Sequence, residues 1–317
     1  MKASSVFSQL DRRLGRRLLG WLVLGLWLAL SVACSELVVS ETRYPLVLVD
    51  NTGVEVRIDA APERIVSMMP SHTEGLCALG DDICDLIIGV DDFSNFPAQI
   101  NTLPRLGSGL TPNLEAIVAL EPDLVLTDEA AGAASERMRD LGLTVYAGTA
   151  ATYPELFENL RILGRIVNRN SEALALNNRI RRDVDAISQQ VAGEVSPRVY
   201  YEVFPDPLFS ASTSSFIGAL IARAGGDNIV PGDLGTFPQL DPEFVVAADP
   251  EVIILASLQS IDDLRARPGW ENISAVRNGR VVSLTEVEID ELSRPAPRIV
   301  DGLRRLAEII HPQLAPF

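Results

Sequence analysis

Glu115-Ala-Ile-Val-Ala-Leu-Glu-Pro-Asp-Leu-Val-Leu126 and Glu243-Phe-Val-Val-Ala-Ala-Asp-Pro-Glu-Val-Ile-Ile254 align without gaps at a constant offset of 128 residues. A residue that favours helix N-caps, Asn113 or Asp241, precedes each copy. A proline ends each predicted helix because it cannot continue one, and a short apolar run typical of a buried strand follows. Two equivalent helix–strand units in one chain predict two lobes of similar α/β architecture.

Short apolar runs alternate with helical patterns on either side of these two units. Before the first long helix we predict strands at 64–69, 85–90, 123–127 and 144–146. Between them we predict helices at 71–79, 114–120 and 138–141. After it we predict strands at 199–203, 252–255 and 281–284, and helices at 216–224, 243–247 and 299–310. The 71–79 helix opens on Ser71-His-Thr-Glu74, a capping-box pattern. Strands that alternate with helices predict parallel sheets with both faces covered.

Between the two halves, residues 153–191 keep a helical spacing of apolar residues, with a candidate break at 168–170. At the other end of the first half, residues 46–58 alternate around Asp50-Asn-Thr-Gly53, which predicts an edge hairpin. We therefore predict a signal peptide at 1–34 and a linker with the hairpin at 35–61. The N-terminal lobe follows at 62–152, the interlobe helix at 153–195 and the C-terminal lobe at 196–317.

The N-terminus has the pattern of a secretory signal. Four arginines between Arg12 and Arg17 precede an apolar run of about fifteen residues, too short for a membrane span of about twenty. Cys34 follows Ser-Val-Ala, as in a bacterial lipobox, which predicts lipidation of Cys34. The alternative is ordinary cleavage after Ala33, which would leave Cys34 as a free thiol.

Charge excludes several functions. The chain carries 27 basic and 43 acidic residues, and loss of residues 1–34 takes the formal charge from −16 to −20. Such a chain is repelled by nucleic acid and by anionic lipid, so membrane association is expected only through the lipid anchor. Lys2 is the only lysine, so the mature part has neither a Schiff-base lysine nor a phosphate-loop lysine.

Cys77 and Cys84 are the only cysteines after Cys34. In an oxidising compartment they are a candidate disulfide. On one continuous helix seven residues rise about 10.5 Å, too far for a bridge, but Gly80-Asp-Asp82 can interrupt the helix. The alternative is two small buried apolar side chains.

Four segments together resemble the cobalamin and iron-siderophore family of ABC-transporter substrate-binding proteins, most of all its cobalamin-binding members. They are Pro62-Glu-Arg-Ile-Val-Ser67 with Pro70-Ser-His-Thr-Glu74, the Asn113 to Asp123 element, Gly225-Gly-Asp-Asn-Ile229 and Arg294-Pro-Ala-Pro-Arg298. The resemblance implies two Rossmann-like lobes joined by one long interlobe helix, with the ligand in the cleft between them. It also implies an ABC permease and ATPase as partners, a monomeric binding protein, and a location in the periplasm or at the outer face of the cytoplasmic membrane.

In that family one glutamate on each lobe docks on permease arginines, and Glu115 and Glu243 occupy those positions. The alternative is that each carboxylate only interacts with its helix dipole, which is worth about 0.3–1 kcal/mol.

Ligand contacts are expected from loops at the carboxyl ends of strands, where open parallel sheets bind ligands. From these loops we select as candidate ligand-binding residues Ser71, His72, Phe93, Phe96, Gly109, Asp128, Phe209, Phe237, Asp290 and Arg294. The resemblance places Phe93, Phe209 and Phe237 against a corrin ring, and Asp290 where an acidic residue meets the ligand. Each phenylalanine has core packing as its alternative. His72 could ligate iron or cobalt, but a lone histidine is more often a hydrogen-bonding wall residue, so no metal site is predicted.

The sequence departs from the cobalamin-binding pattern at Gly109 and Asp128, which are aromatic there. The predicted cleft is therefore roomier and more acidic, with eight carboxylates on its loops against Arg105 and Arg294. A neutral or cationic corrinoid suits this lining better than an anionic catecholate siderophore. We therefore predict a binding protein for a cobalamin-like corrinoid, carried as cargo and not as a cofactor. The alternatives are a ferric hydroxamate siderophore or haem and, from another class, a secreted carboxylate-dependent hydrolase.

Overall fold

The computed structural model describes residues 40–257 and 259–317, and the predicted signal peptide and Cys34 lie outside them. Glu41–Phe317 form one compact unit, which is described below. Within the described residues, none of the helices has the length and apolar character needed to cross a bilayer.

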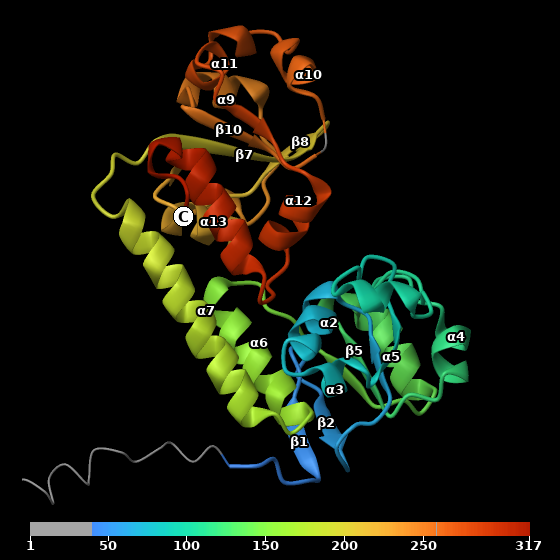
Figure 1. Ribbon diagram of the computed structural model, residues 1–317. Helices are drawn as coiled ribbons and strands as arrows, with labels where there is room; N and C mark the ends of the chain where they lie inside the picture. The colour runs from blue at the N-terminus through green and yellow to red at the C-terminus, as the bar shows by residue number, and fades with distance from the viewer. Residues whose placement is uncertain (1–39, 258) are drawn as a thin grey trace, which may run out of the picture. The chain divides into compact units, whose positions relative to one another are not determined.

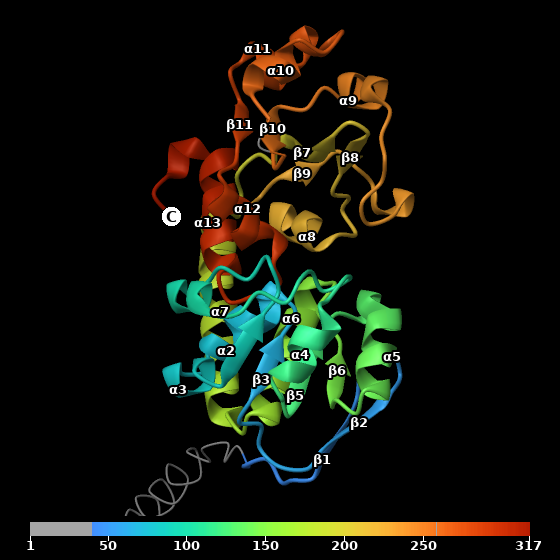
Figure 2. The same cartoon turned by 90° about the vertical axis from the view of Figure 1, so that its right-hand side faces the viewer.

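The N-terminal lobe is built on a four-stranded parallel sheet in the order β4-β3-β5-β6 (Figures 1 and 2). Its strands are β3 Ile65–Ser67, β4 Ile87–Val90, β5 Leu124–Thr127 and β6 Val145–Ala147. Its helices are α2 Pro70–Cys77, α3 Asp81–Cys84, α4 Leu114–Ala119 and α5 Gly132–Asp140, with 3₁₀ turns η1 Ala98–Thr102 and η2 Glu129–Ala131. The predicted hairpin forms a separate antiparallel pair, β1 Leu46–Val49 with β2 Glu55–Ile58.

The C-terminal lobe has a five-stranded sheet in the order β11-β10-β7-β8, with β9 also paired to β7. All pairs are parallel except β7 with β8. The strands are β7 Arg198–Pro205, β8 Leu208–Ser210, β9 Asp227–Asn228, β10 Val252–Leu255 and β11 Val281–Ser283. The helices are α8 Phe216–Arg223, α9 Pro242–Ala248, α10 Ile261–Arg265, α11 Ser274–Arg277, α12 Glu286–Ser293 and α13 Ile299–Ile310. Short 3₁₀ turns lie at η3 Gly232–Leu234, η4 Trp270–Asn272 and η5 Pro312–Leu314. The prediction of two α/β lobes is confirmed.

Two helices, and not one, fill the segment between the sheets. These are α6 Tyr153–Ile166 and α7 Asn170–Val191. The chain breaks at the candidate position because Asn168 adopts a left-handed backbone with φ of +52°. The two helices pack side by side, and the longer one reaches α8 and α13 of the C-terminal lobe (Figure 1). The predicted single long helix is thus a helical hairpin, of which α7 makes the crossing.

The repeated unit folds as predicted. Helices α4 and α9 lead into β5 and β10, and the side chain of Asn113 or Asp241 caps each helix. The capping box predicted at Ser71 and Glu74 is wrong. Met69, not Ser71, is the N-cap of α2, because Pro70 occupies the first helical position. Glu74 therefore lies inside the helix, beyond reach of the cap.

One apolar cluster runs from the hairpin through α6 and α7 to α8 and α13. Two smaller clusters cover the other face of each sheet, one centred on Met68 and Ile117 and the other on Tyr200 and Trp270. Because both lobes share the first cluster, burial of apolar surface holds them together on the side of the helical hairpin.

Candidate functional site

A cavity with a volume of about 630 Å³ lies where the carboxyl ends of the N-terminal strands face α12. Its lining from the N-terminal lobe is Met68, Met69, Pro70, Asp91, Phe93, Ser108, Gly109, Leu110, Asp128 and Ala130. The C-terminal lobe contributes Asp290, Ser293 and Arg294. Apolar side chains thus form the surface, and carboxylates stand around it, as in a site for a bulky apolar ligand with polar edges.

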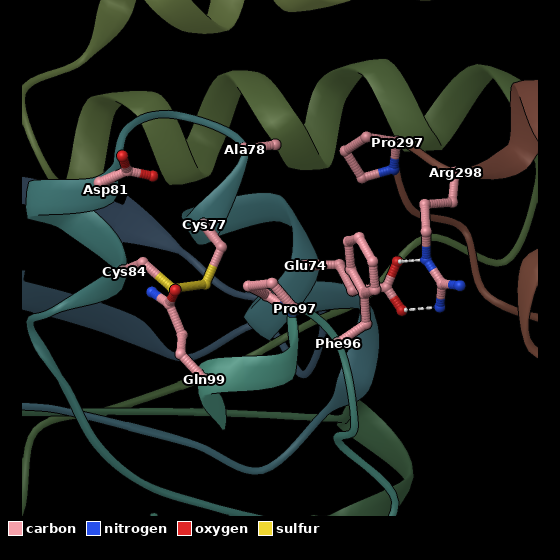
Figure 3. Close-up of a pocket in the computed structure, with 10 residues that line it drawn as sticks. All are labelled: Glu74, Cys77, Ala78, Asp81, Cys84, Phe96, Pro97, Gln99, Pro297 and Arg298. Carbon is pink, nitrogen blue, oxygen red and sulfur yellow. Dashed lines mark hydrogen bonds and ion pairs between the residues drawn. A yellow bond between two sulfur atoms is a disulfide. The ribbon is translucent and has the colours of Figure 1, made fainter. Parts of the chain in front are cut away.

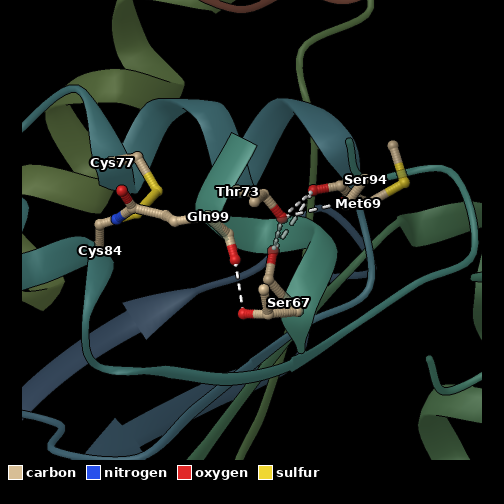
Figure 4. Close-up of a disulfide and its surroundings, with 8 residues drawn as sticks. Ser67, Met69, Thr73, Cys77, Cys84, Ser94 and Gln99 are labelled. Carbon is tan, nitrogen blue, oxygen red and sulfur yellow. Dashed lines mark hydrogen bonds between the residues drawn. A yellow bond between two sulfur atoms is a disulfide. The ribbon is translucent and has the colours of Figure 1, made fainter. Parts of the chain in front are cut away.

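A buried hydrogen-bond network fixes the loop after β4. The Thr73 hydroxyl donates to Ser67 Oγ at 2.8 Å and lies 3.0 Å from Ser94 Oγ (Figure 4). Ser94 in turn donates to the Asp91 carboxylate, and the Phe93 amide donates to Asp91 Oδ2 at 3.0 Å. Burial raises the pKa of Asp91, although these hydrogen bonds and the charge of Arg294 oppose the shift. The hydrogen bond from the Phe93 amide to Asp91 holds Phe93 at the cavity, where this residue is 63% exposed.

A second network connects the lobes next to the cavity. Glu74 of α2 accepts hydrogen bonds from Arg294 at 2.9 Å and from Arg298 at 2.7 and 2.8 Å (Figure 3). Arg294 also bonds Asn95 Oδ1, the Phe93 carbonyl and the Asp290 carboxylate, at 2.8, 3.0 and 2.7 Å. Arg294 thus binds groups of both lobes at the interlobe contact.

The small pocket in Figure 3 lies behind that contact. It has a volume of about 190 Å³, and the Glu74–Arg298 pair and Phe96 form one end of it. Arg298 stacks over the Phe96 ring with the guanidinium carbon 4.2 Å from the ring centroid. Phe96, predicted as a ligand contact, thus packs against the interlobe pair.

At the other end of this pocket, Cys77 and Cys84 form a disulfide (Figure 4). Helix α2 ends at Cys77 and α3 begins at Asp81, so the interruption expected near Gly80 brings the two cysteines to a Cα–Cα distance of 4.2 Å. The structure thereby selects the disulfide over the alternative of two free buried thiols. The bridge fixes the end of α2 one turn after Glu74.

Known proteins share this architecture. The periplasmic binding protein family matches residues 65–288. The chain belongs to this family. A cobalamin-binding protein of Halobacterium salinarum is 33% identical over 283 residues, which cover 84% of this chain and 74% of the relative.

Two solved structures of the family superpose on most of the chain. The periplasmic vitamin B12 binding protein BtuF of Vibrio cholerae has a TM-score of 0.69 at 25% identity, covering 81% of this chain and 99% of BtuF. The periplasmic heme-binding protein RhuT of Roseiflexus sp. RS-1 has a TM-score of 0.70 at 25% identity, covering 80% and 99%. As a periplasmic binding protein the chain is extracytoplasmic, and members of its family bind and transport ligands rather than catalyse reactions.

The structure brings together only part of the predicted ligand set. Phe93, Gly109, Asp128, Asp290 and Arg294 all line the cavity. Phe209 and Phe237 do not line it. They lie on the C-terminal lobe, where Phe237 is 49% exposed and Phe209 is half-buried beside Gln239.

Ser71 and His72 are buried beneath the cavity and reach neither its surface nor solvent. Neither ring nitrogen of His72 has a hydrogen-bond partner of ordinary geometry within the described residues. Burial lowers the pKa of His72 to about 4, with the Gly148 backbone and the Asp128 carboxylate opposing the shift in part. The imidazole is therefore neutral at pH 7, and direct contact of Ser71 or His72 with a ligand stays a prediction.

Asp290, which was selected as a residue of a strand-end loop, lies in helix α12. The prediction was wrong because Thr285 and Glu288 form a capping box that starts a helix there. Helix α12 directs Asp290 toward the N-terminal lobe, where its carboxylate accepts a hydrogen bond from Asn95 at 2.8 Å.

Sequence reasoning missed Met68, Met69 and Leu110, which line the cavity. The sequence could have indicated the two methionines, because they end the strand predicted at 64–69 and ligand contacts were expected at strand ends. Glu74 was missed because its spacing from Ser71 matched a capping box.

Glu115 and Glu243 occupy the same second helical position of α4 and α9. Both are exposed, and neither side chain has an ion pair or hydrogen bond among residues 40–257 and 259–317. Each carboxylate is therefore free to meet a cation from another molecule.

Proposed function

We propose that this chain is the substrate-binding protein of an ABC importer and delivers a cobalamin-like corrinoid to a membrane permease. The observation that carries the proposal is the composition of the cavity. Methionine, proline, leucine and phenylalanine side chains form its surface, and its one guanidinium among the described lining residues, that of Arg294, is engaged by protein groups. A corrin ring with amide side chains presents apolar faces and hydrogen-bond donors, and it needs no cation from the protein.

The similarity to a cobalamin-binding protein and to a vitamin B12 binding protein supports this ligand. Haem is the second candidate, since the chain is equally similar in structure to a heme-binding protein. Haem carries two carboxylates, which are usually bound by arginine or lysine. The described cavity offers them Asp91, Asp128 and Asp290 instead, so haem is the weaker candidate. A ferric hydroxamate siderophore is a third ligand for the same cavity.

Delivery requires contact with a permease. Glu115 and Glu243 support such contact, because they place one unpaired carboxylate at the same helical position in each lobe. Arginines of a permease would form charge-assisted pairs with both. We further propose that Cys34 carries a lipid anchor at the outer face of the cytoplasmic membrane, from its lipobox-like context, and that the protein acts as a monomer.

The absorbance spectrum and mass of the small molecule that copurifies with the protein test the ligand. A corrinoid, recovered chemically unchanged, is the expected result. A hydrolysed corrinoid would favour the hydrolase alternative, and recovery of haem or a ferric siderophore alone would refute the proposed ligand.

A further inference from the structure

Glu74 is the most enclosed charged group at the interlobe contact. Its side chain is 2% exposed, and those of its partners Arg294 and Arg298 are 10% and 13% exposed. Glu74 Oε1 accepts from both guanidiniums, and Oε2 accepts from Arg298 Nε. One carboxylate of the N-terminal lobe thus binds two arginines of the C-terminal lobe.

Other donors of the two arginines also have partners. Arg294 reaches Asn95, Phe93 and Asp290, and Arg298 reaches Glu291 at 3.4 Å. Three carboxylates, from Glu74, Asp290 and Glu291, therefore surround two guanidiniums. The cluster has a formal excess of one negative charge.

This arrangement determines what the cavity offers to a ligand. Arg294 supplies the only guanidinium among the described residues that line the cavity. Its donors point toward Glu74 and the 93–95 loop, so a carboxylate on a ligand would have to compete with a buried protein carboxylate. Competition of this kind fails unless the ligand replaces all of the hydrogen bonds that it breaks.

An apolar contact would hold the lobes together as well as an ion pair does, because removing charges from water costs about as much as their pairing returns. The shared apolar core already joins the lobes through α6 and α7. Stability alone therefore does not explain why a carboxylate with two arginines stands beside the ligand cavity.

We propose that Glu74 is a specificity-determining positioning residue: it holds Arg294 and Arg298 away from the ligand, so that the cleft excludes ligands bearing carboxylates and admits neutral or cationic ones. This inference rests on the proposed function and narrows its ligand class. Glu74 acts through the arginines and does not touch the ligand.

The test compares haemin, which carries two carboxylates, with cyanocobalamin, which carries amides. Both dissociation constants are measured by absorbance titration for the wild type and for Glu74→Gln, which keeps the shape and removes the charge. We expect the preference for cyanocobalamin over haemin to fall about tenfold in Glu74→Gln, because a released guanidinium gains a charge-assisted bond to a haem carboxylate. In the double variant Glu74→Gln with Arg294→Gln, the preference for cyanocobalamin over haemin should return to its wild-type value.

Asp50→Asn is the matched control. Asp50 is also a fully buried carboxylate of the N-terminal lobe, paired with Arg139 at 2.6 Å, and it does not line the cavity. It should leave the ligand preference unchanged. The inference is overturned if Glu74→Gln binds the two ligands in the wild-type ratio, or if Asp50→Asn shifts the ratio equally.

A measurement on the wild type covers the case in which Glu74→Gln does not fold. Cyanocobalamin should bind at least about tenfold more tightly than its derivative in which one side-chain amide is hydrolysed to a carboxylate. Equal affinity would overturn the inference while leaving the proposed function in place. Wild-type protein that binds no corrinoid would refute the proposed function itself, and the inference with it.

Discussion

Reversal of charge at Glu115 and Glu243 together should abolish transport without changing ligand binding. Neither carboxylate has an ion pair to lose within the described residues, so the folding cost of Glu115→Arg with Glu243→Arg is limited to the helix dipoles. That cost is about 0.3–1 kcal/mol for each lost carboxylate, and of the same size again for each arginine put in its place. The folded state should therefore persist, with a small decrease in melting temperature.

The expected effect on docking is larger. Each lost hydrogen bond to a charged group costs about 1.5–3 kcal/mol, so two lost pairs weaken docking by about 3 kcal/mol or more, which is over a hundredfold. The added arginines also repel those of the permease. Uptake of labelled corrinoid into cells is the assay, and titration of the purified variant with the same corrinoid reports ligand affinity.

Glu136→Arg with Glu271→Arg is the control for this experiment. It makes the same change in net charge at one exposed glutamate in each lobe, and these glutamates belong to α5 and η4 instead of α4 and α9. Uptake by the control should equal that of the wild type. The docking role would be refuted if the Glu115 and Glu243 double variant still supported uptake, or if the control lost uptake to the same degree.

Three further outcomes follow from the structure. Burial lowers the pKa of His72 to about 4. Between about pH 6.5 and pH 4 the unfolded chain therefore binds a proton that the folded protein does not. The free energy of unfolding should fall by about 2 kcal/mol from about pH 7.5 to pH 5. Denaturation curves of His72→Gln should lose most of this pH dependence, and an unchanged slope would disprove it. Replacing both Cys77 and Cys84 by serine should lower the free energy of unfolding by about 2 kcal/mol, because the disulfide joins residues seven apart. Equal urea midpoints for the variant and the wild type would show that the disulfide does not stabilise the fold. Phe93→Ala should weaken corrinoid binding by about 1–3 kcal/mol, as a calorimetric titration would show, and wild-type affinity would remove Phe93 from the site.

Local signals made the α/β lobes predictable. Asn113 and Asp241 cap their helices, and an apolar strand follows each, because capping, the helix-ending proline and strand burial all act within a dozen residues. The break in the interlobe helix was predictable for the same reason. Its consequence, two helices packed side by side, depends on tertiary contacts that no local pattern contains.

The site was less predictable, since its residues come from both lobes. Glu74 matched a local capping pattern, but Pro70 moved the helix start and left its carboxylate to pair with Arg294 and Arg298, over two hundred residues away in sequence. Arg294 lines the cavity as predicted, but its hydrogen bonds to Glu74 and to the Phe93 carbonyl depend on the fold and follow no local sequence pattern. Phe209 and Phe237 lie outside the cavity that Phe93 lines, because strand-end loops of the two lobes converge only in part.

A competition titration tests whether this cleft binds a corrinoid. Purified protein is titrated calorimetrically with cyanocobalamin, alone and in the presence of haemin or a ferric hydroxamate siderophore. One cyanocobalamin should bind per chain, and neither competitor should reduce its affinity at equal concentration. Tight binding of haemin or of the siderophore, with no heat from cyanocobalamin, would contradict it.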